Sequence, residues 1–460
     1  MKGAWCALLC VAACITATQH VSAQVRFDPE AGAVGEADQA RNWDQKPGVE
    51  DEDVALFVPR VILVLPRLVL SVVFWLPEQG MVLVDRYHLS ERAERLLYFD
   101  EAHHFGWTPL LAYQSGYGPT AGAKVFHKSL FGHGEEFDIS GVYGGRYTQA
   151  YRLALYADRA FGSRLWLDTQ ARFESEPGLL FGGIGIVEND GASPGEQVGP
   201  RESNELTYLG QDRVLGLLRL GYTAGEGRRL VKFGGTAIFN HRKFEPNSVD
   251  KTPLASVYDP AQVPGLTEHV NTIELQANLL VDLREHHGLD PRGLFFETFI
   301  GGVPDIDRYE YLHYGFELAY TIDLYRATRL LRLRVALEAV EGDDDGIPFT
   351  DLPRLGGSNR LRGYLEAQFR DKRAVLASAE YSYPVHESLH AHLFVDAGYV
   401  AQHYPDLFEL DHWKVGFGGG LLLGNPDEIT FRFDIAYGDG VRVYLGADIA
   451  QAFAGRSDQL

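Results

Sequence analysis

The chain has 460 residues, including 50 glycines, and is 45% hydrophobic and 12% aromatic. Its formal net charge of −21 argues against nucleic acid as a partner, because binding a phosphate backbone needs a clustered positive surface. The three cysteines are Cys6, Cys10 and Cys14, so the rest of the chain holds no disulfide and no cysteine metal site. This composition is typical of an exported protein rich in β-structure.

The N-terminal 23 residues carry the features of a secretory signal peptide. Lys2 precedes an apolar run, and Val21-Ser-Ala23 forms a small-residue cleavage site ahead of Gln24. We therefore expect residues 1–23 to be removed and the mature chain to leave the cytoplasm. A lipoprotein with its lipid attached at Cys14 is the alternative.

Residues 24–105 differ in composition from the rest of the chain. Residues 24–53 are polar and acidic, which favours a disordered linker. Residues 54–105 open with an apolar stretch, 54–76, which two Pro-Arg pairs interrupt seven residues apart. We expect this stretch to lie as an amphipathic segment at the periplasmic membrane surface, or to cap the mouth of the barrel that follows. An uncleaved spanning helix is the alternative.

From residue 106 to residue 453 the chain consists of ~10-residue segments in which hydrophobic and polar side chains alternate, separated by Gly, Pro, Asp and Asn. Such strands present one face to lipid and the other to water. The pattern predicts an all-β fold, a 16-stranded antiparallel transmembrane β-barrel over 106–453, with a C-terminal tail at 454–460. The expected strands are 106–115, 119–129, 135–144, 147–157, 163–173, 206–222, 228–240, 269–283, 291–302, 309–323, 327–340, 372–384, 388–400, 411–424, 427–437 and 440–451.

The connectors between these strands alternate in length. Four long ones, 174–205, 241–268, 341–371 and 401–410, all follow odd-numbered strands, whereas connectors after even-numbered strands are mostly short. Outer-membrane barrels have long outer loops and short periplasmic turns. The alternation therefore predicts a barrel in the bacterial outer membrane with both of its ends in the periplasm.

Two acidic residues and one arginine are the main candidates for a functional site in the lumen. The strand alternation places Glu380 and Asp396 on the lumen side of neighbouring strands. Two facing carboxylates repel each other unless a cation lies between them. Arg362, on the preceding loop, is the candidate cation, and Gly356 and Gly357 would let that loop fold back into the barrel. The alternative leaves Arg362 in solvent and the two acids lining a wet pore.

The loop Leu355-Gly-Gly-Ser-Asn-Arg-Leu-Arg-Gly-Tyr364, with Glu380-Tyr-Ser-Tyr-Pro384 and Phe394-Val-Asp-Ala-Gly398, resembles the barrel domain of the BamA/TamA superfamily, also called the bacterial surface antigen family. That family includes outer-membrane assembly and two-partner secretion translocases. The resemblance implies a sixth outer loop whose Arg-Gly-aromatic tip enters the lumen and binds acids on the inner wall. It assigns Leu361, Arg362, Gly363 and Tyr364 to the tip, Glu380 and Asp396 to the wall, and Gly356 and Gly357 to the loop hinge.

Two features depart from the pattern of that family. Its translocases carry periplasmic polypeptide-transport-associated domains, and residues 24–105 leave room for barely one. We therefore expect a short member without such domains. Chains of the family usually end on an aromatic closing residue, whereas residues 454–460 follow Phe453 here, which leaves open how the final strand is recognised.

The sequence predicts neither an enzyme nor a bound cofactor or metal. The adjacent histidines His103-His104 and His286-His287 would point apart, so neither pair forms a metal site. The acidic run Asp343-Asp-Asp345 lacks the spaced ligands of a calcium loop. The glycine-rich Phe181-Gly-Gly-Ile-Gly-Ile186 lacks the Lys-Ser/Thr of a phosphate-binding loop.

Three functions fit a barrel of this kind, and all place it in outer-membrane lipid. The first is insertion or translocation of polypeptide, or of lipid, through a lateral seam between the first and last strands, with unfolded outer-membrane or secreted proteins as clients. The second is a channel for small solutes, with the loop of Arg362 as its constriction. The third is a structural barrel that anchors a periplasmic partner. We favour the first.

Overall fold

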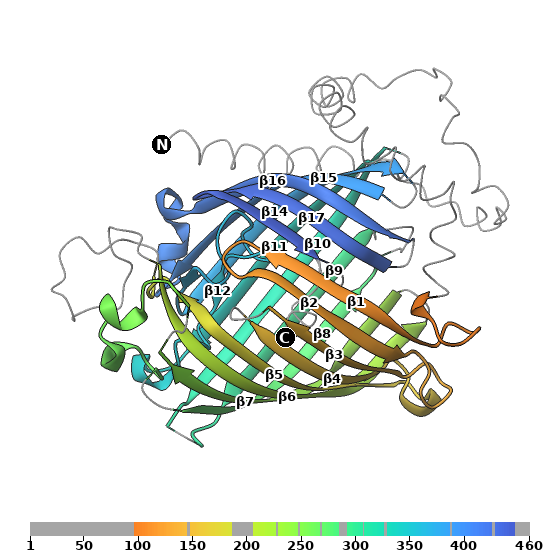
Figure 1. Ribbon diagram of the computed structural model, residues 1–460, viewed down its shortest axis with the longest axis horizontal. Helices are drawn as coiled ribbons and strands as arrows, with labels where there is room; N and C mark the ends of the chain where they lie inside the picture. The colour runs from red at the N-terminus through yellow and green to blue at the C-terminus, as the bar shows by residue number, and fades with distance from the viewer. Residues whose placement is uncertain are drawn as a thin grey trace, which may run out of the picture. The chain divides into compact units, whose positions relative to one another are not determined.

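The computed structural model describes residues 96–144, 148–185, 206–226, 229–246, 249–266, 269–284, 292–306, 308–325, 329–386, 389–425 and 428–446. Sixteen strands form a closed antiparallel barrel, and a separate two-stranded pair lies at one end (Figure 1). The predicted 16-stranded barrel is therefore confirmed. The predicted signal peptide, linker, apolar stretch and C-terminal tail lie outside the described residues.

The wall closes in the order β1-β18-β17-β16-β15-β14-β11-β10-β9-β8-β7-β6-β5-β4-β3-β2. The wall strands are β1 (Phe105–Gln114), β2 (Gly118–His127), β3 (Glu136–Tyr143), β4 (Gln149–Ala157), β5 (Leu165–Phe181), β6 (Thr207–Glu226), β7 (Arg229–Glu245), β8 (Val270–Asp282), β9 (Gly293–Val303), β10 (Tyr311–Tyr325), β11 (Arg329–Glu341), β14 (Arg373–His386), β15 (Leu389–Ala401), β16 (Lys414–Asn425), β17 (Glu428–Tyr437) and β18 (Val441–Gly446). The remaining elements are the pair β12 (Arg354–Leu355) and β13 (Phe369–Arg370), and the 3-10 helices η3 (Ala160–Gly162), η4 (Leu254–Ser256), η5 (Pro260–Gln262), η6 (Asp344–Gly346), η7 (Pro405–Phe408) and η8 (Leu410–His412).

The strand boundaries differ most from the prediction at β5. This strand was expected to end at residue 173 but continues to Phe181, so the long connector begins later. The dipeptide Pro177-Gly178 has the composition of a turn, yet it lies within β5, where the register with β6 shifts between Glu176 and Leu179. Proline is tolerated at such a bulge because no ladder hydrogen bond is needed there.

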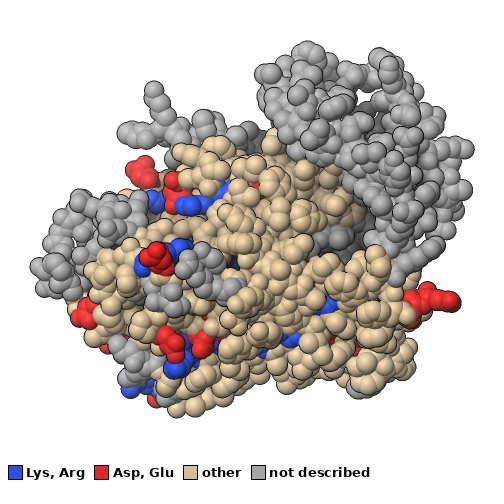
Figure 2. All heavy atoms as spheres, in the orientation of Figure 1, with Lys and Arg blue, Asp and Glu red and all other residues tan. Residues whose placement is uncertain are grey.

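The barrel wall is apolar outside and polar inside, as β10 illustrates. Leu312, Phe316 and Tyr320 are exposed, whereas the alternate residues His313 and Glu317 are buried in the lumen. On the face shown in Figure 2, most of the wall is uncharged, and charged side chains gather mainly at the end that carries the long loops. Within the described ranges no helix is long and apolar enough to cross a membrane.

The long connectors lie at one end of the barrel, which we call the long-loop end (Figure 1). Aromatic rings from β5, β7 and two of these loops pack together there. The ring centroid of Phe181 lies 5.1 Å from that of Tyr258 and 5.5 Å from that of Phe349, and the Phe349 centroid lies 5.3 Å from that of Phe244. Loop 6, residues 342–372, contributes Phe349 to this cluster and joins β11 to β14.

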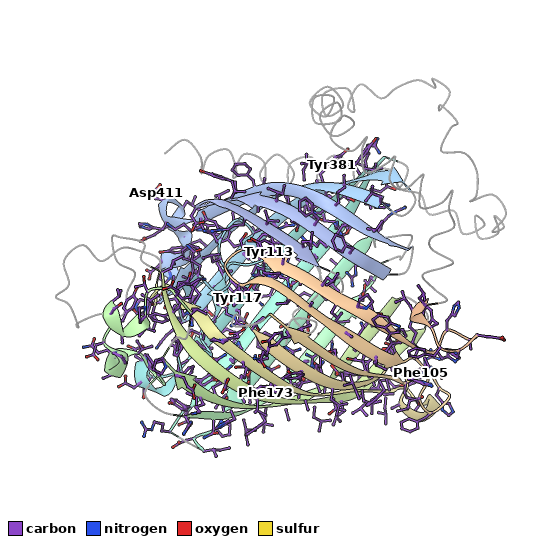
Figure 3. All side chains as sticks on the ribbon, viewed as in Figure 1. Phe105, Tyr113, Tyr117, Phe173, Tyr381 and Asp411 are labelled. Carbon is purple, nitrogen blue, oxygen red and sulfur yellow. The ribbon has the colours of Figure 1, made fainter. Side chains whose placement is uncertain are left out.

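The junction of β1 and β18, which we call the seam, closes the barrel. Residues 112–114 of β1 pair with residues 444–446 of β18, which are the last residues that the structure describes. All ten residues of β1 pair with β2 on its other side. Figure 3 labels Phe105 and Tyr113 towards the two ends of β1, and the pairing with β18 is at the Tyr113 end.

Candidate functional site: a loop tip bound inside the barrel

Loop 6 folds back into the lumen as a compact turn. Gly356 and Gly357 have φ angles of 116° and 93°, which favour glycine. The Gly356 N–H donates to Arg360 O (2.6 Å) and the Gly357 N–H donates to Tyr364 O (3.1 Å), so both glycines close the turn. A Cβ on Gly356 would lie 2.0 Å from Leu365 O. The two glycines therefore sit in a tightly packed loop base, and their role as a hinge remains a prediction.

Arg362 at the loop tip binds two carboxylates of the inner wall, and we call these three residues the tip lock. Its Nε donates to Asp396 Oδ2 (2.7 Å) and its Nη2 donates to Asp396 Oδ1 (2.9 Å). Its Nη1 donates to Glu380 Oε2 (2.7 Å), and its backbone N–H donates to Asp396 Oδ2 (3.0 Å). One arginine thus uses both edges of its planar guanidinium to join two neighbouring strands, β14 and β15.

Further charged groups on the wall surround the tip lock. The second oxygen of Glu380 accepts from Arg332 Nη2 of β11. On β17, Arg432 Nε donates to Asp434 Oδ2 (2.7 Å), while His392 Nε2 lies 2.7 Å from Asp434 Oδ1. Together with the tip arginine and its aspartate partner, these groups make three guanidiniums and three carboxylates. This balance of charge allows the groups to be buried, because an unpaired charge would be costly there.

The tip lock is inaccessible to solvent. Arg362 is 0% exposed, Asp396 2% and Glu380 3%. The guanidinium carbon also lies 3.4 Å from the ring centroid of Phe394, so the face of the group is covered while its edges are hydrogen-bonded. Burial alone would lower the pKa of Arg362, but Asp396 and Glu380 raise that pKa above its ordinary value. Arg362 therefore stays charged at every physiological pH.

Glycines on the wall make room for the backbone of the tip. A Cβ on Gly416 of β16 would lie 1.7 Å from Arg362 O, and one on Gly438 would lie 2.7 Å from Gly363 O. Gly363 itself has a φ of 101° and packs against the backbone of Tyr437. Because real Cβ atoms cannot approach this closely, the tip fits only against a glycine-lined part of the wall.

The residues beside Arg362 extend the contact. Tyr364 Oη donates to Val415 O (3.2 Å), and its ring centroid lies 5.2 Å from that of Phe369. Leu361 is fully buried, with a positive φ of 65°, in an apolar cluster with Leu355 and Tyr399. The predicted tip residues thus pack against the wall together, although their functional role remains to be tested.

The opposite face of loop 6 borders a cavity of about 290 Å³ between the loop and strands β5 to β11. Here Arg360 binds Glu338, and Arg334 Nη1 donates to Asn359 O (2.9 Å). The loop is therefore held on both sides, by the tip lock towards β14–β17 and by Arg334 and Arg360 towards β10 and β11.

The structure brings together every site residue singled out in the sequence. It adds residues that the sequence reasoning did not assign to the site, among them Arg332, Asp434 and Gly416. Another is Tyr444 of β18, whose hydroxyl donates to Tyr364 O (2.9 Å). The alternation within β11 and β17 is a signal that could have placed Arg332 and Asp434 in the lumen. No local signal connects Gly416 or Tyr444 to a loop some 50 to 80 residues earlier.

A closed barrel with a buried loop-tip arginine defines a class of outer-membrane protein. A family model described as the Omp85 superfamily domain matches residues 129–446. The match covers more than half of the chain, so the chain belongs to the Omp85 superfamily, and the resemblance to BamA and TamA is confirmed. Barrels of this superfamily are typical of the bacterial outer membrane, and its members are generally non-enzymatic transporters and insertases that handle client polypeptides.

The solved structure of one BamA protein supports the same fold. The chain resembles the crystal structure of BamA from Haemophilus ducreyi lacking POTRA domains 1–3, with a TM-score of 0.52 and 13% identity over 75% of this chain and 70% of that chain. CdiB from Acinetobacter baumannii gives a TM-score of 0.47 and 12% identity, over 75% of this chain and 59% of that one. No curated protein matches the chain. At this identity the likeness to BamA concerns the fold alone.

Proposed function

We propose that this barrel assists the insertion or translocation of polypeptide at the outer membrane, and that a client strand pairs with β1 at the seam. The observation that carries the proposal is the seam itself, where β1 meets the last strand of the described wall through main-chain pairing. An unpaired strand edge presents backbone N–H and C=O groups that bind another extended chain. A polypeptide strand offers these groups in matching register, whereas a lipid does not.

The composition of β1 also suits a transient partner. Its outward side chains include Leu111 and Tyr113, both exposed on the lipid side. A client strand with its own lipid-facing side would extend the apolar surface without exposing polar groups to the membrane. Membership of a superfamily whose members handle client polypeptides supports the same function.

A solute channel is less well supported. The aromatic cluster of Phe181, Phe244, Tyr258 and Phe349 packs at the long-loop end, and the tip lock lies within the lumen. A channel of constant conductance needs an open path through both regions.

Quantitative outer-membrane proteomics of a deletion strain tests the proposal. We expect a defined set of outer-membrane or secreted proteins to be lost, and to return when the wild-type chain is supplied. The Arg362→Ala variant, which leaves two buried carboxylates without their shared cation, should restore them poorly. A proteome that is unchanged by the deletion would overturn the proposal.

A further inference from the structure

Loop 6 touches both strands of the seam as well as the tip lock. Gln114 Nε2 of β1 donates to Glu366 Oε2 (3.1 Å). Tyr444 Oη of β18 accepts from the Gly363 N–H (3.3 Å) and donates to Tyr364 O (2.9 Å). Gln114 and Tyr444 are themselves register partners across the seam. The loop therefore bonds to both members of one seam pair.

Loop 6 also contacts the two hairpins that flank the seam. Gln368 Nε2 donates to Asp439 Oδ2 (2.8 Å) in the β17–β18 turn. On the other side, the Leu365 side chain packs against Gly116 in the β1–β2 turn, where a Cβ would lie 2.7 Å from Leu365 Cδ2. Four consecutive loop residues, 365–368, thus include contacts to the hairpins on both sides.

The loop contacts lie at the end of the seam next to the β1–β2 and β17–β18 turns. There the Val443 N–H donates to Ser115 Oγ (2.9 Å), beside the register pair formed by Gln114 and Tyr444. Tyr444 is 2% exposed, so its hydroxyl bonds to the loop are shielded from competing water. Loop 6 therefore reinforces the strand pairing at this end of the seam.

We propose that loop 6 is a brace that holds the seam closed, with Gln114, Glu366 and Tyr444 as its positioning residues. This inference rests on the proposed function of the seam. Glu366 follows Arg362 by four residues, so withdrawal of the tip from the wall also withdraws Glu366 from β1. Conversely, a strand that displaces Tyr444 from Gln114 breaks the tyrosine's bonds to the loop. Tip docking and seam closure are then coupled, and each stabilises the other.

A cysteine pair across the seam measures closure without any client. Ser115 N donates to Val443 O, so the alternation of an antiparallel ladder makes Ala112 and Gly446 a non-hydrogen-bonded pair. Such pairs have Cα atoms about 4.5 Å apart, which permits a disulfide. We would oxidise the purified, folded Ala112→Cys/Gly446→Cys barrel and follow the crosslinked fraction with time.

Adding Tyr444→Phe or, separately, Glu366→Ala should lower that fraction several-fold while the heat-modifiable folded form is retained. The matched control is Tyr437→Phe, since Tyr437 is a lipid-facing tyrosine, 50% exposed, on the adjacent strand β17. Glu366→Ala keeps the test decisive should Tyr444→Phe reduce folding, because Glu366 is only partly buried.

Equal crosslinking in wild type, Tyr444→Phe and Glu366→Ala would overturn the brace. That result concerns the closed state alone, so it is separable from the proposed function. An unchanged proteome in the deletion strain would reject the client function and leave the crosslinking result intact.

Discussion

The two sides of the lumen are held together in opposite ways. On one side, β14 and β15 share thirteen register pairs and are joined again by Arg362 through Glu380 and Asp396. On the other, loop 6 bonds to Gln114 of β1 and to Tyr444 of β18. The tip lock joins its two strands through buried charged groups, whereas the seam contacts are hydrogen bonds of a tyrosine hydroxyl and of a partly buried carboxylate. The stronger set of contacts therefore lies away from the place where we propose that the wall opens.

Removing the tip arginine should cause the largest loss in the free energy of unfolding, because the arginine belongs to the buried and charged set of contacts. Arg362→Ala leaves the buried Asp396 without its cation, and breaking a buried pair in this way costs about 3–5 kcal/mol. Denaturant titration of the folded barrel measures the loss. The control is Arg442→Ala, which removes a solvent-accessible pair with Asp439 and should cost about 1 kcal/mol or less. Equal losses in the two variants would mean that the tip lock contributes little.

A second variant blocks docking of the tip without touching a charge. Gly416→Ala would place a Cβ 1.7 Å from Arg362 O, so the loop or the strand must shift, at a cost of about 1–3 kcal/mol. Gly302→Ala is the matched control, since its Cβ would lie 3.7 Å from the nearest atom, Tyr311 O. Thermal unfolding followed by the heat-modified band compares them. If Gly302→Ala destabilises the barrel as much as Gly416→Ala, steric fit at the tip is not the cause.

The smallest effect is expected at the root of loop 6, where burial raises the pKa of Asp371 to about 6. Because this folded-state pKa lies above the ordinary value, the neutral carboxyl stabilises the fold at low pH, and that contribution is lost as the pH rises through about 6. Asp371→Asn should therefore match wild type near pH 4 and exceed its stability by about 1–2 kcal/mol at pH 7. Unfolding midpoints at the two pH values measure this, and a pH-independent difference would contradict it.

Much of the wall could be predicted from the sequence because its pattern is local. The period of two places Glu380 in the lumen from the strand's own residues, and it does the same for Asp396 on the next strand. The error at β5 arose because Pro177-Gly178 has the composition of a turn, and only pairing with β6 shows that it is a bulge. The residues that pair across two strands cannot be predicted from the sequence of either strand alone.

The details of the site were less predictable for a related reason. The resemblance implied which loop residues enter the lumen. It did not imply that Arg332 also donates to Glu380, or that the missing side chain of Gly416 lets the backbone of the tip approach the wall. These contacts depend on barrel register and on the path of a folded loop. Tyr444 illustrates the limit most clearly, since it lies 80 residues after its partner Tyr364 and reads in sequence as an ordinary strand residue.

Hydrogen–deuterium exchange of the folded barrel in a lipid nanodisc tests the contrast between the two sides most directly. Exchange in β-strands requires local opening of the ladder. We predict that amides of β1 facing the seam exchange at least tenfold faster than amides in β14 and β15, and that Arg362→Ala accelerates exchange on both sides. Equal protection of β1 and β15 in the wild-type protein would contradict the account.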